Sequence, residues 1–117
     1  MKSAAASSLR PALDFLVLGG GSAGLAAARR AALSGRSVAL LEQSRLGGTC
    51  VNLGCIPKKV MFNAAHFLTD LHALRHGYGL LPSEPIHLDW PTLKRSRDAF
   101  IQRLNSIYAR NLAQAGI

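Results

Sequence analysis

Three glycines constrain the fold of this chain more than any other feature of its sequence. Gly19, Gly21 and Gly24 give the spacing G-x-G-x-x-G directly after the apolar run "FLVL" at residues 15–18. A short run of apolar residues that stops abruptly at a glycine is typical of a buried strand. The segment after the glycines, "LAAARRAALSG", is rich in alanine and arginine, which favour a helix, and Gly35 is expected to stop it.

A second apolar run, "SVALLE" at residues 37–42, predicts a second strand. Strand, helix and strand in this order indicate a βαβ unit, and such a unit implies parallel strands. The expected fold class is therefore α/β.

In such a unit each glycine has a physical role. Gly19 permits the tight turn out of the strand, Gly21 lets a pyrophosphate approach the backbone, and Gly24 lets the helix pack closely on the strand. Free N–H groups and the helix dipole would then face the phosphates. Ala28 and Gly35 add small residues where helix and sheet should meet. The alternative interpretation of the glycines is an ordinary flexible turn.

An acidic residue ends the second predicted strand. Glu42 lies 18 positions after Gly24, where a carboxylate can accept hydrogen bonds from ribose hydroxyls. The alternative is a solvated strand end. Together these features predict a half-site for the ADP part of a dinucleotide, without separating FAD from NAD(P).

Two helices are expected in the second half of the chain. Residues 60–77 carry an approximate apolar face and end at Gly77, and residues 91–114 follow Asp89 and Pro91, which mark a helix start. Residues 77–89 are a loop by their Gly, Pro and Ser content. The apolar face of the first helix comprises Met61, Ala64, Ala65, Leu68, Leu71 and Leu74, and that of the second comprises Leu93, Arg97, Phe100, Leu104, Ile107 and Leu112.

Charge and hydropathy exclude several classes of function. Fourteen Lys and Arg against six Asp and Glu give a net charge of +8, but the cations are scattered apart from Lys94, Arg95 and Arg97. Without a Cys/His finger or an aromatic RNA-binding strand, the excess fits anionic small molecules better than nucleic acid. The longest mostly apolar run, residues 15–28, is shorter than the roughly 20 residues of a membrane helix. No nucleic-acid or membrane partner is expected.

The only two cysteines, Cys50 and Cys55, lie in "GGTCVNLGCIPKK" at residues 47–59. A zinc site needs four ligands, which this pair and the scattered histidines do not supply, so no metal site is expected. Inert buried thiols remain one reading, although ammonium groups at Lys58 and Lys59 would favour reactive thiolate.

A disulfide is the other reading. Positions five apart in an ideal helix have Cα atoms roughly 8–9 Å apart, whereas a disulfide needs less than about 7 Å. A bridge between Cys50 and Cys55 would therefore need a non-helical turn, which Asn52 and Gly54 would permit.

"LGGTCVNLGCIPKK", together with "GGGSAG" and an acidic strand end, resembles the class I pyridine-nucleotide–disulfide oxidoreductases, which are FAD enzymes. The resemblance runs from about residue 14 to residue 117. Within the family, Pro57-Lys58-Lys59 is similar to the reductases of glutathione, trypanothione and thioredoxin. The glutathione-reducing branch is the most similar, while Arg29 disfavours trypanothione because that substrate is cationic.

The resemblance implies a Rossmann-like FAD-binding βαβ unit followed by two long helices, and it implies roles for individual residues. Cys50 would be the interchange thiol that attacks glutathione disulfide, and Cys55 the thiol next to the flavin. Lys58 would lie by the reactive edge of the flavin. The residues implied to hold FAD are Gly19, Gly21, Ser22, Ala23, Gly24, Glu42, Thr49, Cys50 and Lys58, and those implied to touch glutathione are Ser22, Arg29 and Tyr108. Without the resemblance, Arg29 reads as a solvated cation and Tyr108 as a half-buried core aromatic.

The family is several times longer than this chain, so the resemblance implies an incomplete domain. Residues 1–13 are expected to be a disordered leader, and residues 14–117 the amino-terminal part of the FAD-binding domain. The NADPH domain, which binds the co-substrate, and the interface domain of a homodimer would lie elsewhere. We therefore expect the 117-residue chain alone to be inactive. A cytoplasmic location is expected, with a mitochondrial one also allowed. The alternatives are a segment of a thioredoxin-reductase-like flavoenzyme and a truncated, non-catalytic nucleotide-binding product.

Overall fold

The computed structural model describes residues 12–79 and 86–117. Most of the expected leader (1–13) and the central part of the expected loop (77–89) lie outside the described residues. The elements follow in the order β1 (Phe15–Leu18), α1 (Ser22–Leu33), β2 (Val38–Leu41), α2 (Gly48–Asn52), α3 (Cys55–Gly77) and α4 (Trp90–Gln114).

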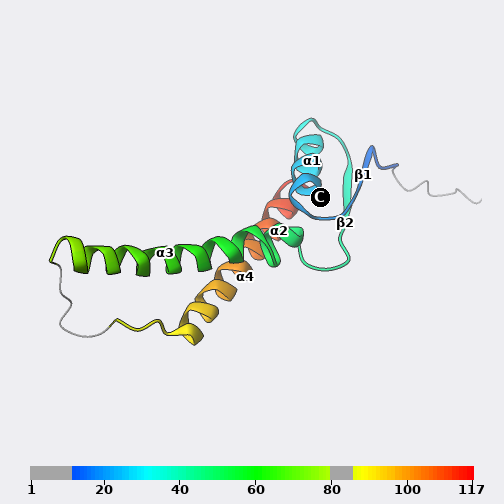
Figure 1. Ribbon diagram of the computed structural model, residues 1–117. Helices are drawn as coiled ribbons and strands as arrows, with labels where there is room; N and C mark the ends of the chain where they lie inside the picture. Colours follow the sequence, from blue (N-terminus) through cyan, green and yellow to red (C-terminus); the bar gives the residue numbers. More distant parts are fainter. Residues whose placement is uncertain (1–11, 80–85) are drawn as a thin grey trace, which may run out of the picture.

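The first three elements form the expected βαβ unit. β1 and β2 are parallel and neighbouring, with Phe15 opposite Val38 and Leu18 opposite Leu41. α1 covers one face of this two-stranded sheet (Figure 1). Its contact with the sheet is a small apolar core of Val17, Ala28 and Val38, in which Ala28 is fully buried. The α/β class and the parallel strands are thus confirmed.

Two of the glycine roles in this unit are also confirmed. Gly19 has φ +102°, a backbone conformation that residues other than glycine rarely adopt. A Cβ atom at Gly24 would lie 1.9 Å from the carbonyl oxygen of Gly19, so only glycine allows α1 to pass this close to β1. The expectation for Gly35 is wrong in part, because a Cβ there would meet no described residue within 4 Å. Gly35 is required for its φ of +75° after the end of α1, not for packing.

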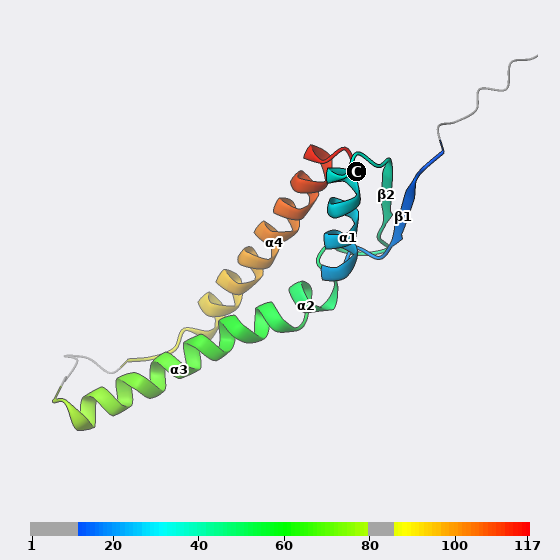
Figure 2. The ribbon, with the colours of Figure 1, turned by 90° about the horizontal axis from the view of Figure 1, so that it is seen from above.

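The second half of the chain is more helical than predicted. α2 was not expected, and α3 begins at Cys55, five residues before the predicted start at residue 60. α3 leads away from the βαβ unit, and α4 returns past α2 to end beside α1 (Figure 2). α4 begins where predicted, since the Asp89 carboxylate accepts from the N–H of Thr92 at 3.2 Å and caps the helix.

The predicted apolar faces are correct only in part. On α3, the predicted residues are half-buried except Ala65, which is exposed. On α4, Ile101 is 5% exposed whereas Phe100 is 40% exposed, so the prediction for Phe100 is wrong. Successive helical residues are rotated by about 100°, so at this turn of α4 the buried position is Ile101 and not Phe100, while the other five predicted residues are half-buried or buried.

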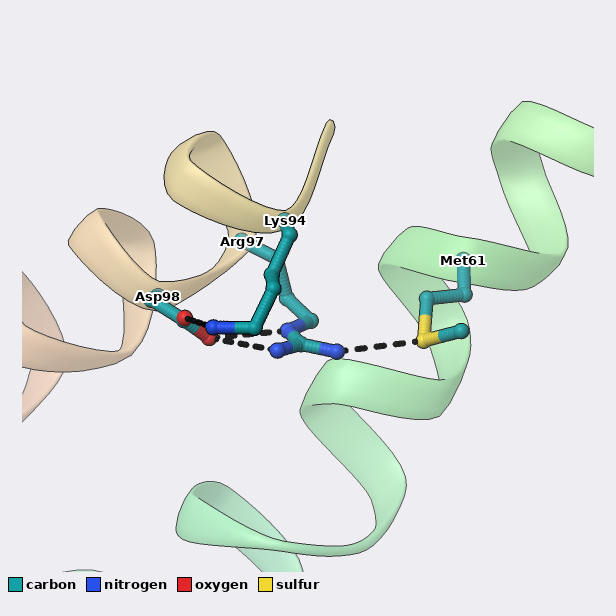
Figure 3. Close-up of polar contacts among 4 residues, drawn as sticks. All are labelled: Met61, Lys94, Arg97 and Asp98. Atoms are coloured by element: carbon teal, nitrogen blue, oxygen red, sulfur yellow. Dashed lines mark hydrogen bonds and ion pairs between the residues drawn. The ribbon is translucent and has the colours of Figure 1, made fainter. Parts of the chain in front are cut away.

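A polar cluster, which we call the α3–α4 clasp, consists of Met61, Lys94, Arg97 and Asp98 (Figure 3). Arg97 donates to Asp98 through Nε at 2.9 Å and Nη2 at 2.7 Å, and through Nη1 to the Met61 sulfur at 3.4 Å. Lys94 donates to the same carboxylate at 2.9 Å. The hydrogen bonds from Lys94, and then from Arg97, lower the pKa of Asp98. Two cations of the predicted basic cluster are therefore internally paired.

Candidate nucleotide and dithiol site

The N-terminus of α1 has the geometry of an anion-binding site. The N-cap residue of α1 is Gly21, and no side chain caps the helix. A Cβ atom at Gly21 would find its nearest neighbour, the Cα atom of Gly48, 4.0 Å away. Among the residues that the structure describes, none requires glycine at position 21 for packing, and they leave the space before it free for a ligand. The first N–H groups of a helix carry no intrahelical partner, and together with this space they fit a pyrophosphate.

Glu42 follows β2 directly and lies beside this turn, as predicted. Its carboxylate accepts from the N–H of Gly20 at 2.6 Å and from the N–H of Ser44 at 2.8 Å. The hydrogen bond from Gly20, followed by that from Ser44, lowers the pKa of Glu42. A carboxylate has about four lone-pair sites, so the two backbone bonds fix its orientation and leave capacity for hydroxyl donors.

A loop connects this turn to the cysteines. The N–H of Gly47 donates to the carbonyl of Gly20 at 2.7 Å, and Gly21 and Gly47 form an isolated parallel bridge. Gly47 and Gly48 both have positive φ, and a Cβ at Gly48 would lie 3.0 Å from the Cα of Gly21. The start of α2 therefore touches the start of α1. The sequence shows Gly47 and Gly48 beside the cysteines, but their contact with the glycine turn was not predicted, although two adjacent glycines after a strand are a signal for positive φ.

The two cysteines lie on either side of a break between two helices. Cys50 is in α2, Cys55 is the first residue of α3, and Leu53 and Gly54 separate the helices. A Cβ at Gly54 would be 3.1 Å from the Thr49 carbonyl oxygen, so the backbone doubles back tightly here. The predicted non-helical turn is thus present at Gly54. The expectation for Asn52 is wrong, because Asn52 is the buried last residue of α2 and not part of the turn.

Both cysteines are free thiols in this structure. Cys50 is half-buried and Cys55 is exposed. A side-chain hydrogen bond with Cys55, followed by burial, raises the pKa of Cys50. Cys55 is therefore the main influence on the pKa of Cys50. The expectation that the ammonium groups of Lys58 and Lys59 favour thiolate is not supported for Cys50, because the neighbouring thiol and burial raise its pKa and both lysines are exposed.

The remaining predicted cofactor residues lie around the same region. Ser22 and Ala23 are exposed in the first turn of α1, and Thr49 is exposed in α2. Lys58 is exposed one turn after Cys55, where it borders a groove of about 650 Å³ between α3 and α4. The position of Lys58 beside a flavin stays a prediction.

A second groove brings the three predicted substrate residues together. Ser22 and Arg29 from α1 and Tyr108 from α4 line one groove of about 430 Å³. Arg29 is exposed and Tyr108 is half-buried, so a guanidinium and a phenol are both accessible from one surface. We call this the α1–α4 groove. Its Ser22 end adjoins the glycine turn.

Within residues 12–79 and 86–117, no cluster of three or more potential metal ligands occurs. Across the same residues, no helix combines the length and the apolar character that crossing a membrane requires. His66 lies 3.8 Å from Asp70 across an exposed turn of α3, and His72 stacks at a tilt on His76.

The chain is similar to one protein family, and to named members of it, over most of its length. Residues 13–115 match the family model described as pyridine nucleotide-disulphide oxidoreductase. The chain is 52% identical over 105 residues to glutathione reductase of Schizosaccharomyces pombe, covering 89% of this chain and 22% of the relative. It is 47% identical over 110 residues to glutathione reductase of Yarrowia lipolytica, covering 92% and 23%. It is 48% identical over 110 residues to glutathione reductase of Debaryomyces hansenii, covering 89% and 22%. The chain thus spans less than a quarter of the length of these relatives.

Proposed function

The chain belongs to the pyridine nucleotide-disulphide oxidoreductase family, and on this premise we propose that it is the FAD-binding and redox-dithiol segment of an NADPH-dependent reductase of glutathione disulfide. The observation that carries the proposal is geometric: Cys50 and Cys55 lie on either side of the helix break at Leu53 and Gly54, and α2, which carries Cys50, begins against the glycine turn. Relatives that bear the name glutathione reductase support the choice of substrate.

FAD fits the residues at the glycine turn. The uncapped start of α1 and the free space before Gly21 suit its pyrophosphate, and the oriented carboxylate of Glu42 suits ribose hydroxyls. When bound, FAD would accept two electrons from NADPH and pass them to the Cys50–Cys55 disulfide. The residues proposed to hold it are Gly19, Gly21, Ser22, Ala23, Gly24, Glu42, Thr49, Cys50 and Lys58.

The dithiol then reduces the substrate by two exchange steps. The raised pKa of Cys50 means that its thiol must first lose a proton. The Cys50 thiolate attacks one sulfur of glutathione disulfide, the substrate S–S bond breaks, and one glutathione leaves as a thiolate that takes up a proton. Cys55, as thiolate, attacks the Cys50 sulfur of the mixed disulfide, releases the second glutathione, and closes the Cys50–Cys55 bond. Two electrons pass from the dithiol to the substrate.

The α1–α4 groove is the proposed seat of glutathione. Glutathione carries two carboxylates, and a guanidinium such as that of Arg29 binds carboxylates in a planar fork. Because the Ser22 end of the groove adjoins the glycine turn, and α2 begins against that turn, a bound disulfide can extend from Arg29 toward Cys50. Delivery of hydride from NADPH and assembly into a homodimer are assigned in this proposal to parts of the protein outside these 117 residues.

The experiment that tests this assignment is Arg29→Gln in the full-length flavoenzyme. The KM for glutathione disulfide is expected to rise about 10- to 100-fold, because hydrogen bonds between charged groups contribute about 1.5–3 kcal/mol. The kcat and the KM for NADPH are expected to change little, because Arg29 lies away from the cysteines. Steady-state kinetics with both substrates varied measures these constants.

Arg103→Gln is the matched control, since Arg103 is an exposed cation of α4 that does not border the α1–α4 groove. An Arg29→Gln enzyme with an unchanged KM for glutathione disulfide would remove the groove from the substrate site. Absence of glutathione-disulfide reduction in the unmodified enzyme would reject the proposed function itself.

A further inference from the structure

Asn52 is the one buried polar residue of the described chain, with 9% of its surface exposed. Its Nδ2 donates to the carbonyl of Leu46 at 3.1 Å and to that of Gly48 at 2.9 Å, and it is 3.4 Å from the carbonyl of Arg45. One side-chain amide thus binds three backbone carbonyls at the start of α2 and in the loop before it. Only the Asn52 side chain itself is buried, so its amide must find its hydrogen-bond partners within the protein.

A second amide joins this loop to α4. Asn105 donates through Nδ2 to the carbonyl of Leu46 at 2.7 Å and to Oδ1 of Asn52 at 3.0 Å. An Asn side chain has two N–H donors, and both are used. Asn105 is half-buried, and its partners are 59 and 53 positions away in the sequence.

Asn52 and Asn105 link the helix that carries Cys50 to the helix that carries Tyr108 of the α1–α4 groove. On one side, Asn52 ends the helix that carries Cys50. On the other side, Tyr108 of the α1–α4 groove follows Asn105 by one turn of α4. Residues three apart on a helix are neighbours on its surface, so a displacement of Asn105 relative to α2 is also a displacement of the groove relative to Cys50.

Other contacts hold α4 in place without Asn105. The α3–α4 clasp joins Arg97 to Met61 (Figure 3), and Ile101 and Leu112 bury apolar surface on either side of Asn105. Loss of the Asn105 amide therefore removes the two hydrogen bonds that join α4 to Leu46 and Asn52, while these other contacts keep α4 packed.

We propose that Asn105 is a positioning residue for disulfide exchange, which acts through Leu46 and Asn52 to fix the Cys50 thiol relative to substrate in the α1–α4 groove. This inference rests on the proposed function. Asn105 touches neither substrate nor sulfur. Displacement of reacting atoms by about 1 Å can lower a rate by up to about 10²-fold, so the interchange step is sensitive to its loss.

Asn105→Asp in the full-length flavoenzyme tests the inference. The shape is kept, but a carboxylate cannot donate to the Leu46 carbonyl. In anaerobic stopped-flow measurements, we expect re-oxidation of the reduced enzyme by glutathione disulfide to slow by about 10-fold or more. Reduction of the flavin by NADPH should stay within about twofold of the unmodified enzyme, because that step does not require contact between Cys50 and substrate.

Gln102→Glu is the matched control, because it makes the same amide-to-acid change on an exposed side chain one turn earlier in α4. It should leave both half-reactions unchanged. If Asn105→Asp does not fold, Asn105→Ser, which keeps a single donor, is measured in the same way. Equal slowing of both half-reactions, or re-oxidation at the unmodified rate, overturns the positioning role while the proposed function stands. An unmodified enzyme that glutathione disulfide cannot re-oxidise overturns both.

Discussion

Replacement of Cys50 by serine in the full-length flavoenzyme is expected to reduce turnover with glutathione disulfide to background, a loss of about 10⁴-fold or more. A serine oxygen cannot form the mixed disulfide that the exchange requires. Cys50 and Cys55 are the only cysteines of the chain, so no other residue of this segment can replace the Cys50 thiol. NADPH oxidation at saturating glutathione disulfide measures the loss.

Cys55→Ser provides the matched comparison. It should also be inactive in turnover, but it keeps the attacking thiol and lacks the thiol that resolves the mixed disulfide. One glutathione should therefore stay covalently attached to Cys50 in Cys55→Ser, and none in Cys50→Ser, as measured by intact-protein mass spectrometry. Attachment to the Cys50→Ser protein instead, or turnover above about one-tenth of normal in either variant, would contradict the assigned roles.

The second large effect separates two glycines of the same turn. Gly24→Ala places a Cβ 1.9 Å from the Gly19 carbonyl oxygen, which forces α1 away from β1 and should lower the free energy of unfolding by about 3 kcal/mol or more. In Gly21→Ala the new Cβ meets nothing closer than 4.0 Å among residues 12–79 and 86–117, and Gly21 has an ordinary φ of −74°. This variant should leave the stability of the flavin-free protein within about 0.5 kcal/mol, yet weaken flavin binding by about tenfold or more by occupying the approach of the pyrophosphate.

Urea unfolding of the flavin-free proteins and fluorescence titration with FAD measure the two effects. Gly77→Ala is the control, because a Cβ at Gly77 would meet nothing within 4 Å and no positive φ is required there. Unchanged FAD affinity in Gly21→Ala would show that the turn is only structural. Unchanged stability in Gly24→Ala would contradict the close approach of α1 to β1.

The βαβ unit could be predicted from the sequence because its signals are local. The apolar runs at residues 15–18 and 37–42 contain the observed strands, and the glycine spacing between them identifies the turn. Gly24 could be assigned because the motif itself places a glycine where helix and strand must approach. For Gly35 the predicted stop of the helix is confirmed and the predicted packing role is wrong, because a small residue at a helix end can serve either purpose and the sequence does not distinguish them.

α2 could not be predicted, because its stability comes from distant residues. "GGTCVN" has the composition of a loop, and its helical turn depends on Asn52 and Asn105, which are 53 positions apart. The same limit applies to the α1–α4 groove, since Arg29 and Tyr108 are adjacent only after α4 returns to α1. Their pairing was expected from the family resemblance and not from any periodicity.

The effect of Cys55 on the pKa of Cys50 also could not be predicted from the sequence. Charge counting favoured a thiolate stabilised by Lys58 and Lys59, whereas the turn at Gly54 brings Cys55 to Cys50 and raises the pKa of Cys50. A neighbour five positions away in sequence becomes the dominant partner only when the helix is broken.

The most direct test of the account is the redox state of the two cysteines in the full-length flavoenzyme. Peptide mass mapping of the oxidised protein under non-reducing conditions is expected to find a Cys50–Cys55 disulfide, and anaerobic NADPH is expected to convert it to two alkylatable thiols. Two free thiols in the fully oxidised protein, or a disulfide that NADPH leaves intact, would contradict the proposed path of electrons to the substrate.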